Sequence, residues 1–326
     1  MSGLQSRTVR GLPFTLLLIL ASGCGEGGPP GRGGGEDPDL PGASVDDPTA
    51  QPQATSLFGE ALFAKPDTTG AIARADQALA RAPDSVELIL AAGRVRRNFW
   101  QYRQAMELYS RAASLVPGDW RPYRYRGHRH ISLRQFDEAI QDLERARDLA
   151  PLNWDVAYHL GLAYFLAGRF DEATNEYLRC LQLADDSGAR AAQTEGFRSC
   201  AQNGTDPDSR VAMTEWAVRA ALRSGRDPVV SELLASIPTD LPVEENLAYY
   251  HDLLFYKGER TAEDLLNPGP GAPYRMETVG YGIANWYVAR GDTARAVQLL
   301  ETLVEDPWWP GFGRISAEVE LFRLTR

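Results

Sequence analysis

The sequence predicts an all-α protein built from repeated pairs of antiparallel helices. Small residues and prolines recur every 34 positions over the first half of the chain, and a fixed period of this length is typical of stacked helical repeats. The recurring positions are Pro83, Pro117 and Pro151; Gly59, Gly93, Gly127 and Gly161; Ala71, Ala105, Ala139 and Ala173; and Ala78, Ala112, Ala146 and Cys180.

Each repeat is predicted to contain a first helix with the glycine and a second helix with the two small residues seven positions apart. Residues without bulk at these crossings let the two helices approach closely. The proline lies just beyond the second helix, which it cannot continue. The segments "RQFDEAIQDLERARDLAP" (134–151) and "GRFDEATNEYLRCLQLAD" (169–186) both place acids in the first turn, where the helix dipole favours them.

This pattern resembles the tetratricopeptide repeat. The resemblance implies a superhelical solenoid of antiparallel helix pairs whose first helices line a concave groove. We assign four units to residues 54–185, degenerate repeat-like helices to 186–274, and a further unit with a capping helix to 275–326. In the last of these, Ala284, Tyr287, Gly291 and Ala296 are in register.

The N-terminal residues predict export. Residues 1–23 combine a basic start with the apolar run "GLPFTLLLIL", which is typical of a signal peptide. The following "ASGC" resembles the lipobox of bacterial lipoproteins, and this resemblance implies acylation of Cys24. Residues 24–53 are rich in glycine and proline and form a predicted disordered tether. Gly25 rather than aspartate follows the cysteine. By the sorting pattern of bacterial lipoproteins, the resemblance therefore implies an outer-membrane anchor that faces the periplasm.

Composition and motifs exclude several classes of function. The formal net charge of −10 disfavours nucleic-acid binding. The chain has no phosphate-binding glycine loop and no motif of a hydrolase or metalloprotease, so we predict a non-catalytic protein without cofactors. His128 and His130 point about 200° apart on a helix and cannot share a metal ion.

The basic segment "WRPYRYRGHRH" (120–130) is predicted to be the first helix of the third unit. Helical geometry places Arg121, Arg124, Tyr125 and His128 on one side, which the repeat resemblance assigns to the groove. Neighbouring first helices add further residues to the same side. These are Arg94, Arg97, Asn98, Tyr158, His159 and Phe165.

Two interpretations of this surface remain open. Arginines hold carboxylates bidentately, so the groove is predicted to bind an acidic or carboxylate-terminated polypeptide. Alternatively, the arginines form a solvated face that balances acidic second helices. Replacing Arg121 and Arg124 by glutamate is predicted to abolish binding without changing the melting of the fold.

The remaining cysteines and the C-terminal aromatics give two further expectations. If residues 188–201 form one helix antiparallel to that of Cys180, then Cys200 lies about 13 Å out of level with it, and both are free thiols. The turn "DPWWPGFG" brings Trp308, Trp309 and Phe312 before the last helix. These aromatics either cap the solenoid or pair two subunits as a homodimer.

The order of lipobox, repeats and final helix resembles NlpI-type outer-membrane lipoproteins. This resemblance implies a membrane-anchored scaffold that brings envelope proteins together without catalysis. The alternative is an obligate structural subunit of an envelope assembly machine, as in outer-membrane or pilus biogenesis.

Overall fold

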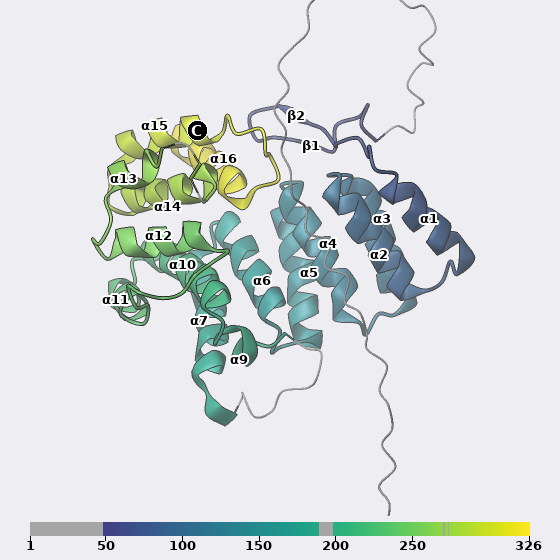
Figure 1. Cartoon of the computed structure of the whole chain (residues 1–326), viewed down its shortest axis with the longest axis horizontal. Coiled ribbons are helices and arrows are strands. Elements are labelled where there is room, and N and C mark those ends of the chain that lie inside the picture. Colours follow the sequence, from purple (N-terminus) through teal and green to yellow (C-terminus); the bar gives the residue numbers. More distant parts are fainter. Residues whose placement is uncertain (1–47, 189–197, 270, 273) are drawn as a thin grey trace, which may run out of the picture. The chain divides into compact units, whose positions relative to one another are not determined.

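The computed structural model describes residues 48–188, 198–269, 271, 272 and 274–326, and it confirms the all-α fold class. The predicted signal peptide, Cys24 and most of the predicted tether lie outside these residues. In Figure 1 the helices follow one another as stacked pairs from the purple to the yellow end of the chain. None of the described helices is long and apolar enough to cross a membrane.

The first unit lacks its first helix. Residues 54–62 instead form a hairpin of two short antiparallel strands, β1 (Ala54–Thr55) and β2 (Ala61–Leu62). Gly59 lies in the turn with φ of 88°, a left-handed conformation that glycine adopts without steric cost. Its place in the glycine series therefore does not mark a helix crossing, and only the second helix of this unit is present.

The next three units are regular helix pairs, as predicted. After α1 (Ala71–Arg81), the pairs are α2 (Val86–Asn98) with α3 (Tyr102–Leu115), α4 (Trp120–Ser132) with α5 (Phe136–Leu149), and α6 (Trp154–Leu166) with α7 (Phe170–Asp185).

The glycine series fixes how closely the two helices of a pair approach. A Cβ atom added at Gly127 would lie 2.7 Å from the side chain of Leu143, and one at Gly161 would lie 2.4 Å from Tyr177. The alanines of the second helices, such as Ala139, are fully buried. The small residues are therefore needed at the crossings, as the sequence predicts.

The C-terminal half continues the stacking with shorter pairs. After the short α9 (Cys200–Asn203), α10 (Pro207–Arg223) packs on α7. The remaining elements are α11 (Asp227–Ala235), α12 (Leu247–Tyr256), α13 (Ala262–Leu266), α14 (Met276–Ala289), α15 (Thr293–Leu303) and α16 (Phe312–Thr325).

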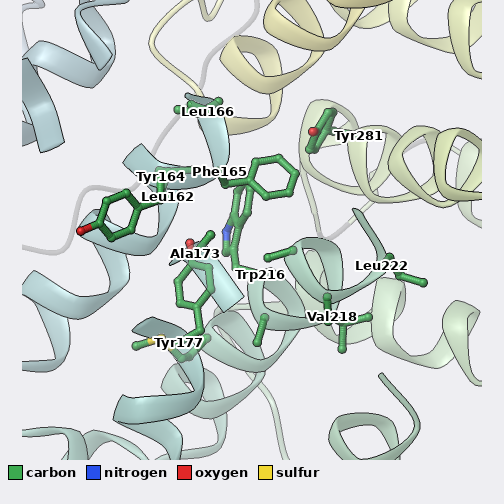
Figure 2. Packing of buried hydrophobic residues seen from close by; sticks show 14 of the residues in the cluster. Leu162, Tyr164, Phe165, Leu166, Ala173, Tyr177, Trp216, Val218, Leu222 and Tyr281 are labelled. Atoms are coloured by element: carbon green, nitrogen blue, oxygen red, sulfur yellow. The ribbon is translucent and has the colours of Figure 1, made fainter. Parts of the chain in front are cut away.

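The largest hydrophobic core lies where α6 and α7 meet α10 and α14. Figure 2 shows Phe165, Trp216 and Tyr281 converging there, with Tyr177 beneath them. The rings of Phe165 and Trp216 meet edge to face at 5.4 Å between centroids. Such pairs contribute about 0.5–1.5 kcal/mol beyond the burial of their area.

A charged cluster is enclosed in the same region. The fully buried Arg219 of α10 pairs with Glu215 and with Asp252 of α12. Burial raises the pKa of Asp252 well above its usual range, and Glu215 adds repulsion. One guanidinium faces two carboxylates in this cluster. Removing any one of the three side chains would leave a buried charge without its partner and would destabilise the packing.

The cysteine prediction is wrong, because Cys180 and Cys200 form a disulfide with their Cα atoms 5.2 Å apart. Cys200 does not continue a helix antiparallel to α7; it begins the separate helix α9, which Ser199 caps. Gly204 then lets this segment approach α7, because a Cβ there would lie 2.0 Å from Ala184. Most of the predicted helix 188–201 lies outside the described residues.

The C-terminal helix α16 returns to the N-terminal hairpin. Trp309 is buried between Trp100 and Tyr102, and its indole Nε1–H donates to the carbonyl of Phe63 at 3.0 Å. Trp309 and Phe312 therefore pack within the chain, which supports the capping interpretation, while Trp308 remains exposed.

Candidate functional site

One face of α4 opens into a cavity of about 660 Å³. Its lining includes Arg121, Arg124, Tyr125 and His128, the four residues of this helix that the sequence assigns to the groove. Volumes of roughly 300–1,000 Å³ are usual for ligand sites. We call this cavity the α4–α6 pocket, because α6 forms the facing wall with Tyr158 and His159.

Helix caps hold the two principal walls in place. The Asp119 side chain caps α4 by accepting from the backbone N–H of Arg121 at 2.9 Å. Asn153 caps α6 by accepting from the N–H of Val156 at 3.0 Å. Each cap satisfies a donor that the first helical turn leaves free. The N-terminal turns of α4 and α6 are thus fixed.

Arg124 lies at the centre of the pocket wall. It is buried, and its guanidinium pairs with Asp155 at 2.5 Å and lies 3.2 Å from Nε2 of His159. Burial opposes ionisation of Asp155, but the charge of Arg124 outweighs it and lowers the pKa of this carboxyl. Arg124 is therefore neutralised within the chain.

Arg121 is also paired. Its guanidinium contacts Asp119 at 2.6 Å and Glu87 of α2 at 2.7 Å, while a third of the side chain stays exposed. Hydrogen bonding to Asp119, and then to Glu87, raises the pKa of Arg121. The two arginines are thus less available to an anionic ligand than the sequence predicts.

Two neutral imidazoles line the inner end of the pocket. The rings of His128 and His159 lie 4.3 Å apart, and Phe312 of α16 packs against both. Burial, with Arg124 second, lowers the pKa of His159 to about 3. Burial, with Arg129 second, lowers the pKa of His128 well below its usual value. No group of three metal-ligating side chains is present among the described residues.

Four residues assigned to the groove lie outside the pocket lining. Arg94 touches its edge, because its guanidinium approaches the hydroxyl of Tyr125 at 3.5 Å. Arg97 instead contacts Asn98, which is exposed.

The assignment of Phe165 to the groove is wrong. This residue is fully buried and packs on Trp216 and Tyr281. Seven residues after Tyr158 it lies on the same side of α6, but α10 and α14 fill the groove there.

Arg129 adds a buried positive charge on α4, outside the pocket lining. Arg129 of α4 is 3 % exposed, and its guanidinium lies 4.5 Å from the centroid of the Tyr102 ring. Burial lowers the pKa of Arg129 to about 10, and repulsion from Arg97 and Arg124 adds to the effect.

Several pocket residues were missed by the sequence analysis. Trp120, Asn153, Trp154 and Asp155 belong to α4 and to the start of α6, and the others come from later parts of the chain: Arg198, Asn203, Ser209, Ala212, Asn246, Tyr249 and Phe312. The hydroxyls of Tyr249 and Tyr158 lie 3.1 Å apart, so α12 closes the far side. Asn246 is held by Asp208, which accepts its backbone N–H at 2.6 Å. The degenerate repeats carry no sequence period that would predict these positions.

Comparison with known proteins supports the repeat assignment. Models of the tetratricopeptide repeat match residues 124–188 and 279–306, which contain α4–α7 and α14–α15. The chain therefore contains tetratricopeptide repeats, and proteins with such repeats are generally non-catalytic, protein-binding scaffolds. No curated protein matches the chain in sequence.

Solved structures of similar architecture include three examples. The crystal structure of MamA has 18% identity and a TM-score of 0.39 and covers 58% of this chain and 88% of its own. The crystal structure of YrrB, described as a TPR protein with an unusual peptide-binding site, has 14% identity and a TM-score of 0.39. The match covers 74% of this chain and 97% of YrrB. The structure of Naa15/Naa10 bound to HypK-THB has 17% identity and a TM-score of 0.35. The match covers 76% of this chain and 36% of the matched chain.

Proposed function

We propose that this protein is a non-catalytic, lipid-anchored scaffold of the bacterial cell envelope that binds a short polypeptide segment in the α4–α6 pocket. The observation that carries the binding role is the pocket itself, where Tyr158 and Tyr249 line the cavity together with Arg121, Arg124 and Tyr125 of α4. Tyrosine and arginine are enriched at the energetically important centres of protein interfaces.

The side chains of the pocket limit the class of polypeptide segment that it can bind. Because Asp155 and Asp119 neutralise the two arginines of α4, the pocket favours a segment with an aromatic or apolar side chain. An acidic group or a terminal carboxylate would lie toward Arg198, which is exposed at the pocket, or toward Arg94 at its edge. A volume of about 660 Å³ suits one or a few residues rather than a long segment.

The proposed lipid anchor is inferred from the N-terminal sequence. The proposed role in the envelope is inferred from the resemblance to NlpI-type lipoproteins. Metabolic labelling with an alkyne analogue of palmitate tests this directly. We expect label on the wild type and none on Cys24→Ala, which should also leave the precursor unprocessed. An unacylated wild-type N-terminus would contradict the anchor.

The binding role is tested by photo-crosslinking in cells. A photoreactive phenylalanine analogue at Tyr125 should give discrete protein adducts, whereas the same analogue at Arg81, an exposed position on α1, should not. Arg198→Glu should weaken the Tyr125 adducts. Equal adducts at both positions would contradict a binding pocket. Adducts at both positions to one constant partner would favour the alternative of an obligate assembly subunit.

A further inference from the structure

A second cavity, of about 530 Å³, lies between β2 and the loop that joins α15 to α16. Residues 60–64 form one wall, and residues 304–307 with Trp309 form the other. We call it the β2 cleft. It shares no lining residue with the α4–α6 pocket, so it is a separate site that does not depend on the proposed function.

The outer edge of β2 faces this cleft. The carbonyls of Glu60 and Leu62 accept from Ser56 and Gln53 and so point toward β1. Successive residues of a strand direct their backbone groups to opposite sides, so Ala61 and Phe63 point away from β1. The bond from Trp309 to the Phe63 carbonyl confirms this direction. Within the described part of the chain, the N–H and C=O of Ala61 have no hydrogen-bond partner.

The same edge is already paired at its far end. The N–H of Lys65 donates to the carbonyl of Phe99 at 2.8 Å. The unpaired stretch at Ala61 thus lies next to backbone that does find partners outside the hairpin. An exposed strand edge of this kind is a template for an added strand.

Trp100 forms part of the cleft in a strained conformation. Its φ is 59°, whereas Gly168 occupies the turn two repeats later with φ of 80°. A residue other than glycine is disfavoured there by crowding of its Cβ. Here the strain places the indole in the cleft wall, against Trp309.

The charge of the cleft is negative. Glu60, Glu305 and Asp306 line it, against one lining arginine, Arg314. Arg314 is nearly buried and pairs with Glu60 and Glu318, so it offers little positive charge to a ligand. Glu305 is exposed. Asp306 is paired with Arg275 at 3.5 Å. A cationic side chain that enters the cleft would therefore find its least compensated carboxylate at Glu305.

We propose that the β2 cleft binds an extended segment of a partner protein that pairs with Ala61 as an added β-strand and presents a lysine or arginine to Glu305. Main-chain hydrogen bonds supply the pairing, and the acidic rim supplies the choice of side chain. The exposed ring of Phe63 offers an apolar contact to the neighbouring residue of the segment.

The test measures fluorescence anisotropy of a dye-labelled peptide with the full-length chain. The probe peptide alternates valine and threonine around a central arginine. The control peptide has glutamate in place of that arginine. We expect the arginine peptide to bind at least about threefold more tightly. Methylating the amide nitrogens along one edge of the peptide should abolish binding, and methylating those along the other edge should not.

Two variants locate the site. Glu305→Lys should weaken the arginine peptide about threefold or more, while Glu301→Lys, exposed on α15 and outside the cleft, should not. Ala61→Pro removes the outward N–H and should also weaken binding. Equal binding of the arginine and glutamate peptides, or indifference to methylation on either edge, would overturn the proposal. Self-association of the chain through this face, unaffected by the arginine peptide, would overturn it too.

Discussion

Arg134 and Glu318 form an ion pair across the molecule at 2.7 Å, with side chains that are 3 % and 0 % exposed. Arg134 ends the turn between α4 and α5 with φ of 63°, a position that Gly168 fills in the next repeat. The Glu318 carboxylate of α16 also accepts the backbone N–H of Leu57 and a bond from Arg314. This pair joins the third repeat, the C-terminal helix and the N-terminal hairpin.

The first prediction concerns this pair. Arg134→Ala leaves Glu318 buried with fewer partners and should lower the free energy of unfolding by about 3 kcal/mol. Arg134→Gly loses the same contacts but relieves the left-handed backbone, so it should be about 1 kcal/mol more stable than the alanine variant. Urea denaturation of the three chains measures both differences. An alanine variant as stable as the glycine variant would show that the turn is unstrained.

The second prediction concerns the disulfide. Cys180 and Cys200 are separated by 20 positions, and a crosslink over a loop of this length stabilises by about 3 kcal/mol. Cys200→Ser should lower the melting temperature, and reductant should then change it no further. Wild-type protein should melt lower in reductant. A wild type that is insensitive to reductant, with two titratable thiols after unfolding, would mean that the disulfide is absent.

The third prediction tests the repeat register. Ala139 is fully buried, and its carbonyl lies 3.3 Å from where a Cβ of Gly127 would be. Ala139→Leu should overpack the crossing and destabilise by about 1–3 kcal/mol. Gln141→Leu, on the exposed side of α5, is the control and should change the unfolding free energy by less than about 0.5 kcal/mol. Similar losses in both variants would contradict the packing described.

The fourth prediction concerns pH. The folded chain keeps His159 neutral down to a pKa of about 3, whereas the unfolded chain takes up its proton near 6.5. Stability from this group is therefore present above pH 6.5 and is lost as the pH falls toward 3, by about 2 kcal/mol at pH 5. His159→Gln should remove that part of the loss between pH 7 and 5. Unchanged pH dependence in the variant would show that His159 titrates normally.

The structure also revises one expectation for the groove. Arg124→Glu would set a carboxylate against Asp155 in a buried site, so the double replacement with Arg121→Glu should destabilise the fold rather than leave its melting unchanged. Binding experiments are better made with Arg198→Glu, because that side chain is exposed.

Local periodicity determined much of the fold. The recurring glycines and alanines lie at helix crossings, and helical geometry alone places Arg121, Arg124, Tyr125 and His128 on one face. These features depend on a repeated local pattern along the chain, so one amino-acid sequence is enough to predict them. The prediction of a helix crossing at Gly59 was wrong, because a left-handed turn and a close helix crossing both favour glycine.

Contacts between distant segments were decided only by the tertiary structure. The groove is closed at Phe165 by Trp216 and Tyr281, the pocket arginines are neutralised by Asp155 and Asp119, and Cys200 reaches Cys180 from a separate helix. None of these follows from a period, because the sequence between residues 186 and 274 no longer repeats clearly and so sets no register for the helices that fold back. Their positions depend on which buried surfaces and charges become complementary once the whole chain is packed.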